Sequence, residues 1–374
     1  MLKSLKIENF RGFQSFELQQ LGRINLLVGE NNSGKTSILE AIQIFYSRAN
    51  LDLLSQTMTN RGEMLWNEDQ KSVPVSRERE LDIRHLFYSH EISLDSKFLI
   101  LGSDDNFQDS VSASVSIHEL DNNEQADLFD LTAENEDLRG LDFNIIWNLS
   151  GEHEGFRLPL SPNGGLPINY ARRIRRSLKN STIRTRFVPL SSLTIDEMIE
   201  LFDQVVLQPE EEVIVQALQI LDPAIARIAS VGGGAERYRS GMKGGFVVRR
   251  SDNDQRLPIG SMGDGIWRML GLSLAAVRTK GGVLLVDEVD TGLHFTTMVK
   301  MWRMLWETAK QSNVQIFATT HSRDCWESLA ELVEAEKVDE DEITIHRIER
   351  QKPNSAVFDA EMIVIAANQG IEVR

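Results

Sequence analysis

The spacing of hydrophobic and polar residues changes along this chain, and each change predicts a structural element. Residues 2–10 alternate apolar and polar positions, which indicates a half-buried strand. Residues 23–29 form a continuous apolar run that ends at a glycine, as a buried strand does. Residues 37–45 repeat apolar positions at helical spacing. The first part of the chain therefore predicts a strand, a glycine-rich turn and a helix in that order.

The middle of the chain carries a weaker pattern. Residues 91–102 and 110–120 are typical of strands, whereas the polar residues 121–140 are typical of a solvated loop. We therefore predict a mostly β insertion over residues 51–165, which acts as an arm of the molecule. Within it, residues 82–91 are the candidate for a lid segment near a site.

A mainly helical region is predicted over residues 166–250. Thr194 and Glu197 stand before an apolar run in the pattern of a helix capping box. Seven basic residues and no acidic residue occupy positions 172–186, so this segment is the best candidate to contact DNA, RNA or an acidic partner. A solvated helix that balances neighbouring acidic groups is the alternative interpretation.

From residue 251 onwards, helical and buried-strand patterns alternate. A helix is predicted from Gly265 to Arg278, followed by a buried strand at residues 281–288 and another at residues 314–320. Between these strands, large apolar residues recur at helical spacing. The predicted parts of the chain are residues 1–50, 51–165, 166–250 and 251–374.

Composition narrows the class of protein. The 374-residue chain has a formal net charge of −16, which argues against a generally adhesive nucleic-acid binder but allows a local basic face. It carries a single cysteine, Cys325, so an intramolecular disulfide is impossible. We find no apolar run of membrane-spanning length and no signal-peptide pattern at the start. A cytoplasmic location, without a membrane partner, is therefore expected.

The segment GENNSGKT, residues 29–36, matches the phosphate-loop pattern G-x-x-x-x-G-K-[ST] at every fixed position. Gly29 and Gly34 let the backbone curl so that successive N–H groups face the phosphates. Lys35 is expected to reach the β- and γ-phosphates of ATP, and the Thr36 hydroxyl to ligate Mg²⁺. The nucleotide-binding set also includes the loop residues Asn31, Asn32, Ser33 and Ser37.

A second motif, GGVLLVDE at residues 281–288, places two acids at the end of a buried strand. Asp287 is expected to hold Mg²⁺, and Glu288 to orient the attacking water. Lys35 and Asp287 are 252 positions apart. GTPases, kinases, AAA+ motors and ABC-type ATPases share the phosphate loop, but a gap this long indicates a nucleotide core split by a large insertion.

This split core resembles the ABC-type ATPases of the SMC/RecF group and the OLD proteins. VDTGLH after Glu288 is similar to the D-loop of that family, with Asp290 facing the dimer partner. IFATTHS places His321 where the family has a histidine that contacts the γ-phosphate, which makes Lys35, Glu288 and His321 the expected catalytic residues. ENFRGF resembles an N-terminal turn in which the residue matching Arg11 lies near the nucleotide.

The turn SMGDG is similar to the signature motif of the same family, although Asp264 stands where many members have glutamine. In that family the motif crosses to the γ-phosphate bound by a second subunit. Ser261 would then donate a hydrogen bond to that phosphate, and Gly263 would allow the backbone to approach. The resemblance implies a homodimer that encloses ATP and Mg²⁺. It also implies an α/β fold, the ABC-type P-loop ATPase head, with a mixed sheet flanked by helices and a large α+β insertion between the phosphate loop and the signature motif.

Two domains common in such proteins are missing from the sequence. The 53 residues after His321 are too few for a TOPRIM nuclease domain, and no long coiled coil is readable. The resemblance therefore implies a stand-alone ATPase with a separately encoded effector, of nuclease or TOPRIM type, in DNA repair or anti-phage defence. A slow ATPase that serves as sensor or scaffold for a partner protein is the alternative. A transporter subunit fits less well, because its two motifs lie closer together.

Overall fold

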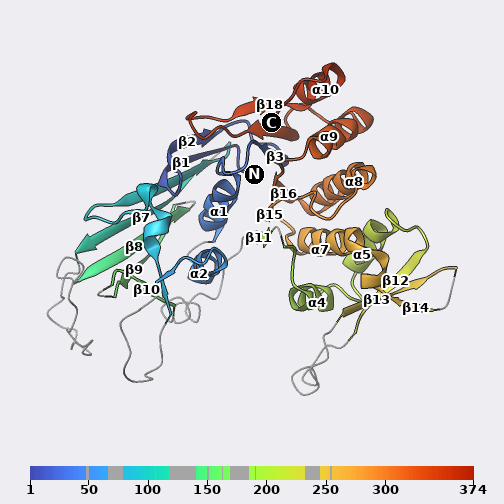
Figure 1. Ribbon diagram of the computed structural model, residues 1–374, viewed down its shortest axis with the longest axis horizontal. Coiled ribbons are helices and arrows are strands. Elements are labelled where there is room, and N and C mark those ends of the chain that lie inside the picture. The colour runs from blue at the N-terminus through green and yellow to red at the C-terminus, as the bar shows by residue number, and fades with distance from the viewer. Residues whose placement is uncertain are drawn as a thin grey trace.

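The structure is a computed structural model of the chain (Figure 1), in which two sheets are joined by a layer of helices. It describes residues 1–47, 50–65, 79–105, 107–117, 140–149, 151–161, 163–168, 185–189, 191–231, 245–252 and 255–374. Among these residues, no helix is both long enough and apolar enough to cross a bilayer.

A six-stranded sheet forms the centre of the molecule, in the order β11-β15-β16-β3-β17-β18. Its strands are parallel except β18, which runs antiparallel to β17 at one edge. The strands are β3 (Ile24–Val28), β11 (Thr185–Val188), β15 (Val283–Val286), β16 (Gln315–Thr319), β17 (Ile343–Arg347) and β18 (Ala356–Phe358). Segments more than 250 positions apart therefore lie side by side, as the split-core prediction requires.

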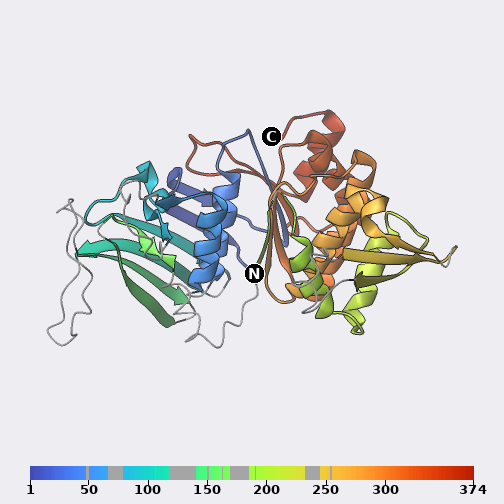
Figure 2. The same cartoon turned by 60° about the horizontal axis from the view of Figure 1, so that its bottom comes forward.

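Helices and a second sheet bury both faces of this central sheet. In β15, Leu284 and Val286 join one hydrophobic core, whereas Val283 and Leu285 join the other. Continuous apolar strands follow from this double burial. One face packs on α1 (Lys35–Tyr46); the other packs on α7 (Asp264–Arg278), α8 (Phe295–Ser312), α9 (Arg323–Glu336) and α10 (Ala360–Gln369). Figure 2 shows α1 and the later helices on opposite sides of the central sheet.

Strands of the predicted β insertion join β1 and β2 from the start of the chain in a second, antiparallel sheet, ordered β2-β1-β6-β7-β8-β9. Its strands are β1 (Ser4–Phe10), β2 (Phe13–Leu18), β6 (Lys97–Ser103), β7 (Gln108–Ile117), β8 (Leu141–Leu149) and β9 (Glu152–Pro159). A small sheet of β4 (Met64–Leu65), β5 (Glu80–Leu81) and β10 (Leu166–Pro167) adjoins it. Because β1 pairs with both β2 and β6, the expected division at residue 50 does not coincide with a break in this sheet.

Two elements of this mostly β region are helical. Residues Leu51–Asn60 form a helix, α2, whose first turn is capped by the Asn50 side chain. Residues 82–91 form two short 3₁₀ turns, η1 (Ile83–Leu86) and η2 (Tyr88–His90).

The region predicted as mainly helical contains both helices and strands. Helices α4 (Ile195–Asp203) and α5 (Pro209–Gln219) are present, and the Thr194–Glu197 capping box is confirmed. However, β12 (Ile225–Val231), β13 (Gly245–Arg250) and β14 (Arg256–Pro258) form a further antiparallel sheet. Most of the basic segment 172–186 lies outside the described residues, but its last two residues begin strand β11 rather than continuing a helix.

Candidate functional site

The phosphate loop lies between β3 and α1 and depends on its two glycines. Gly29 has φ +145° and Gly34 has φ +102°, values that side-chain-bearing residues rarely adopt. A Cβ at Gly29 would collide with the Ile348 carbonyl oxygen, and one at Gly34 would collide with the Phe13 ring. The loop's curvature is therefore fixed by its sequence. The phosphate loop leads directly into the N-terminus of α1, where backbone N–H groups favour an anion.

Lys35 curls back over this loop. Its ammonium donates hydrogen bonds to the carbonyl oxygens of Gly29, at 2.8 Å, and Glu30, at 2.9 Å. Burial lowers the pKa of the ammonium below its ordinary value, and the carboxylates of Glu288 and Asp287 oppose that shift. Ser33 is buried, and its hydroxyl has no hydrogen-bond partner among the described residues. Both groups are thus placed as donors for phosphate oxygens.

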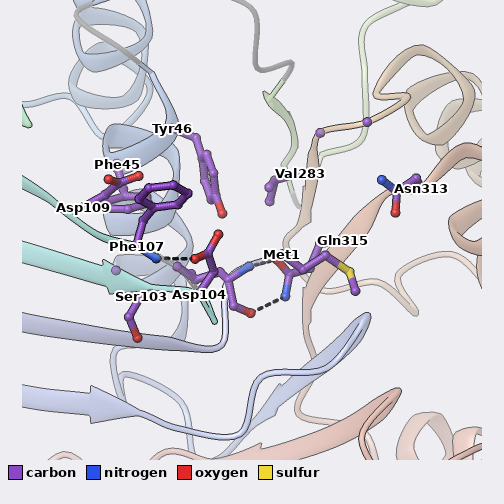
Figure 3. A pocket seen from close by; sticks show the side chains of 14 residues that line it. Met1, Phe45, Tyr46, Ser103, Asp104, Phe107, Asp109, Val283, Asn313 and Gln315 are labelled. Atoms are coloured by element: carbon purple, nitrogen blue, oxygen red, sulfur yellow. Dashed lines mark hydrogen bonds between the residues drawn. The ribbon is translucent and has the colours of Figure 1, made fainter. Parts of the chain in front are cut away.

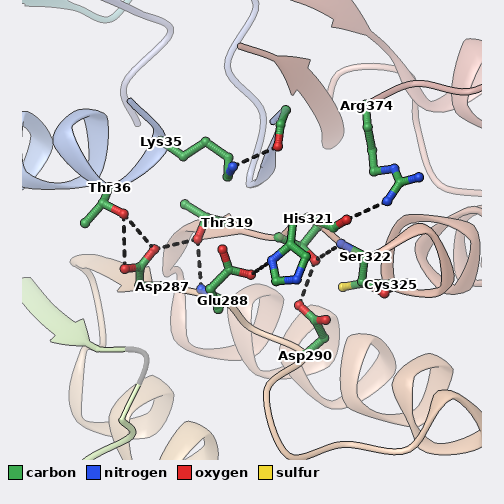
Figure 4. A network of polar contacts seen from close by, with 12 residues as sticks. Lys35, Thr36, Asp287, Glu288, Asp290, Thr319, His321, Ser322, Cys325 and Arg374 are labelled. Carbon is green, nitrogen blue, oxygen red and sulfur yellow. Dashed lines mark hydrogen bonds and ion pairs between the residues drawn. The ribbon is translucent and has the colours of Figure 1, made fainter. Parts of the chain in front are cut away.

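Thr36 and Asp287 meet at the carboxyl edge of the central sheet (Figure 4). The Thr36 hydroxyl lies 3.2 Å from each carboxylate oxygen of Asp287, although 251 positions separate the two residues. A hydroxyl and a carboxylate are ligands that suit Mg²⁺, which keeps several waters and takes the rest of its shell from substrate phosphates. In the described part of the chain no cluster of three or more acidic, histidine or cysteine side chains could hold a metal alone. The pair therefore fits a nucleotide-bound Mg²⁺ rather than a protein-only site.

Glu288, directly after Asp287, is held in an uncommon backbone conformation. Its φ is +46°, in the left-handed region. Its backbone N–H donates to the Thr319 hydroxyl at 2.8 Å, and its carboxylate lies 2.7 Å from His321 Nδ1. Backbone strain of this kind persists only where the surroundings hold it in place. Here the strain aims the carboxylate away from the sheet and toward the histidine (Figure 4).

Thr319 was not among the sequence-predicted residues, yet its hydroxyl touches both acids. It donates to Asp287 Oδ1 at 2.6 Å while it accepts the Glu288 N–H, and it is fully buried. The next residue, Thr320, donates to Asp290 Oδ1 at 2.7 Å. The expected D-loop residue Asp290 therefore contacts its own chain in this structure.

Arg268 on α7 is a second residue that sequence reasoning missed. Only 3% of it is exposed, and its guanidinium donates to the carbonyl oxygens of Asp287 at 3.1 Å, Glu288 at 2.7 Å and Pro189 at 3.3 Å. Burial lowers the pKa of this guanidinium to about 10, against the opposing effect of nearby acids. The sequence marks this residue only as an arginine within the mostly apolar residues 266–277.

The turn that carries Ser261 opens onto solvent at the start of α7. Ser261 lies in a short 3₁₀ turn, η4 (Ile259–Met262), and its hydroxyl donates to the Pro258 carbonyl at 2.7 Å. Gly263 has φ +97°, and a Cβ there would meet nothing within 4 Å. The same turn lies beside the D-loop, since a Cβ at Gly265 would be 3.7 Å from the Gly292 carbonyl oxygen.

Arg11 lies beside the phosphate loop, but its charge is engaged. Its guanidinium is 2.6 Å from Glu63 Oε1 and 2.8 Å from Glu40 Oε2, and all three side chains are nearly buried. Burial raises the pKa of Glu40, and the arginines around it oppose that shift. Arg11 also lines a cavity of about 480 Å³ with Ser33 and other residues, among them Ser37, Arg61, His85 and Arg350. A nucleoside attached to phosphates in the loop would have room there.

The sheet order and the converging loops define this chain as a P-loop ATPase of the ABC type, in the SMC/RecF/OLD group. Residues 24–324 match the family described as "AAA domain, putative AbiEii toxin, Type IV TA system", and the chain belongs to that family.

Among curated proteins, an "ATP/GTP phosphatase" of Helicobacter pylori is 21% identical over 348 residues, covering 89% of this chain and 88% of the relative. The "DNA replication and repair protein RecF" of Rickettsia massiliae is 53% identical over 45 residues, 12% of each chain.

Two solved structures are also similar. The SMC head domain from Thermotoga maritima covers 96% of this chain and 98% of its own, with 15% identity and a TM-score of 0.45. An SMC head domain bound to the C-terminal domain of ScpA, from Pyrococcus furiosus, covers 99% of both chains, with 11% identity and a TM-score of 0.47. The fold is assigned from the strand order of the central sheet and from the residues that meet at its carboxyl edge, and not from these two structures.

Proposed function

We propose that this chain hydrolyses ATP as a switch that pairs two copies around the nucleotide. Each ATP would be held by the phosphate loop of one copy and covered by the Ser261 turn of the other. The contacts across the nucleotide exist only in the paired state, so ATP binding shifts the population toward the dimer. Hydrolysis then releases the copies.

One observation carries this proposal. The phosphate loop begins α1 on one face of the central sheet, whereas the Ser261 turn begins α7 on the opposite face. The two turns therefore serve helices on opposite faces of the sheet, and the Ser261 hydroxyl bonds to Pro258 rather than to the phosphate loop of its own copy. The turn is nevertheless exposed and backed by a helix N-terminus, which suits an anion. A phosphate delivered by a second copy fits both facts.

The hydrolytic roles follow from the positions of the site residues. Lys35 and the loop N–H groups hold the phosphates, while Thr36 and Asp287 would bind Mg²⁺, which neutralises charge on the β- and γ-oxygens. Glu288 accepts a hydrogen bond from the attacking water and orients it toward the γ-phosphorus. The water oxygen forms a bond to that phosphorus and gives up a proton to the Glu288 carboxylate, while the bond from the phosphorus to the bridging oxygen breaks and ADP leaves with that oxygen. His321, in contact with Glu288, is placed to donate to the γ-phosphate.

A role in DNA repair or anti-phage defence, with a separately encoded effector, extends the proposal. It is supported by the similarity to a family described as an AbiEii-type toxin domain and to a DNA replication and repair protein. The competing function is a sensor that hydrolyses ATP slowly while it holds a partner. Turnover measured with and without DNA ends separates the two, because a sensor keeps a low rate under both conditions.

The dimer is tested with Glu288→Gln, which keeps the side-chain shape but cannot orient water as a carboxylate does. With ATP and Mg²⁺ this variant should accumulate as a dimer in size-exclusion chromatography with light scattering. Ser261→Arg added to it should remain monomeric while ATP affinity stays within about threefold. A Glu288→Gln protein that binds ATP and stays monomeric would refute the pairing. Loss of ATP binding in the Ser261 variant would show that this turn serves its own copy.

A further inference from the structure

The last residues of the sequence fold back onto the site. Helix α10 ends at Gln369, and Gly370 turns the chain with φ +66°. The N–H of Ile371 then donates to the Ala366 carbonyl at 2.8 Å. Val373 is fully buried in the same hydrophobic core as α9. The segment after α10 is therefore fixed against the body of the molecule rather than extended into solvent.

This fixed segment aims the Arg374 side chain at the turn after β16 (Figure 4). Glu372 holds the guanidinium through two contacts, Nε to Oε1 at 2.9 Å and Nη2 to Oε2 at 3.1 Å. The remaining nitrogen, Nη1, donates to the His321 carbonyl oxygen at 2.6 Å. The planar fork of arginine suits such an arrangement, because one carboxylate fixes its orientation while a third nitrogen stays available.

The turn that Arg374 contacts carries two further links to the site. Thr320 donates to Asp290, and the His321 ring lies against the Glu288 carboxylate. The Ser322 N–H closes the turn by donating to the Thr320 hydroxyl at 2.9 Å. Among the side-chain hydrogen bonds of the described residues, Arg374 makes the one that holds the His321 carbonyl. This bond restrains the backbone of His321, from which the ring extends to Glu288.

We infer that Arg374 is a positioning residue for His321, which holds the turn after β16 so that the ring meets Glu288 and the γ-phosphate. This inference rests on the proposed ATPase function. Arg374 contacts the His321 backbone and not the phosphate loop, so we expect it to affect the rate of hydrolysis rather than the affinity for ATP.

The first test compares Arg374→Gln and Arg374→Lys in steady-state ATP hydrolysis. The glutamine variant should lower kcat about tenfold and leave KM for ATP within about twofold. The lysine variant keeps a cationic donor and should recover at least a third of the lost rate. A glutamine variant with wild-type kcat, or one that changes KM alone, would overturn the inference. Arg303→Gln is the matched control, because Arg303 is also exposed and paired with a carboxylate, that of Glu336, but lies on α8 rather than beside Glu372.

A double-mutant cycle with His321→Ala shows whether Arg374 acts through the histidine. If it does, Arg374→Gln should cause no further loss of kcat in the His321→Ala protein. Independent, multiplicative losses would indicate a general structural role and overturn the inference.

Hydrogen–deuterium exchange separates this inference from the proposed function. Backbone amides in residues 319–325 should exchange several-fold faster in Arg374→Gln than in wild type, and Arg374→Lys should lie between them. If the wild type does not turn over ATP, the proposed function fails, whereas the exchange result still decides whether Arg374 holds the turn. Unchanged exchange in Arg374→Gln would overturn the inference in either case.

Discussion

Thr319→Val is the substitution that most directly tests how the two acids are held. Valine matches threonine in shape but has no hydroxyl, so it removes the bond to Asp287 and the acceptor of the Glu288 N–H. A net hydrogen bond to a charged group is worth about 1.5–3 kcal/mol, and an orphaned buried donor costs about 1–3 kcal/mol. Because the two effects share one side chain, we expect a loss of about 2–4 kcal/mol in unfolding free energy.

We expect Thr319→Val to lower kcat even in protein that remains folded, so its loss of activity exceeds the loss that reduced stability causes. Glu288 has φ +46°, and without the Thr319 contact one restraint on that conformation is gone. A carboxylate displaced from the attacking water loses stabilisation of the transition state, and about 2.7 kcal/mol corresponds to a hundredfold loss in rate. Thr319→Val should therefore reduce kcat about a hundredfold under conditions where it remains folded.

The assay is phosphate release at saturating ATP, with urea denaturation measured on the same preparations. Thr319→Ser keeps the hydroxyl and deletes only a buried methyl group, so it should cost about 1 kcal/mol of stability and less than fivefold in kcat. A folded Thr319→Val enzyme with kcat within threefold of wild type would refute the reasoning. So would a serine variant that loses as much activity as the valine variant.

Three further predictions concern other parts of the site and fold. Lys35→Ala should abolish measurable ATP binding in calorimetry, and an unchanged affinity would contradict the phosphate-loop assignment. Arg268→Met removes the guanidinium bonds to three carbonyl oxygens, although those of Pro189 and Glu288 keep a backbone N–H donor. It should therefore lower the free energy of unfolding by about 2–4 kcal/mol; a loss below about 1 kcal/mol would show that the clamp is not structural. Burial lowers the pKa of His346 to about 3, so between its ordinary value of 6.5 and that value the unfolded chain binds a proton that the folded chain does not. Stability should therefore fall with pH below 6.5 by about 1.4 kcal/mol per unit from this group, and His346→Gln should flatten the urea-midpoint profile accordingly.

The elements around the nucleotide could be predicted from sequence because each has a local signal. A buried strand that ends in glycine and leads into a helix specifies the phosphate loop, and a buried strand that ends in Asp287 and Glu288 specifies its partner. The wide gap between Lys35 and Asp287 in turn predicted that distant segments share one sheet. Each motif is specified by a single stretch of chain, and the spacing between the two motifs specifies that they belong to one split core.

What could not be predicted depends on contacts between stretches. In the sequence, Thr319 is only the polar last residue of an apolar strand. Its contacts with Asp287 and Glu288 form because β15 and β16 lie side by side in the fold. Arg374 contacts a carbonyl 53 positions away, so no local pattern marks it. Helix α9 buries an apolar stripe against α8, but the acidic residues from Glu331 onwards interrupt its hydrophobic pattern in the sequence. Helix α2 was missed because the surrounding strand-like composition dominated the interpretation.

The turn after β16 connects these separate observations. Within three consecutive residues, Thr319 contacts both acids, Thr320 contacts Asp290, and His321 contacts Glu288 through its ring and Arg374 through its carbonyl oxygen. Arg268 then ties the backbone of those same acids to α7, the helix that begins beside Ser261. A change that moves this turn must therefore change the contacts of Asp287, Glu288 and Asp290 together, the residues proposed as metal ligand, water-orienting acid and D-loop. In the proposed dimer, the D-loop and the Ser261 turn face the second copy. The same linked contacts would therefore transmit a change at the γ-phosphate to the dimer interface, without a further segment that has to move.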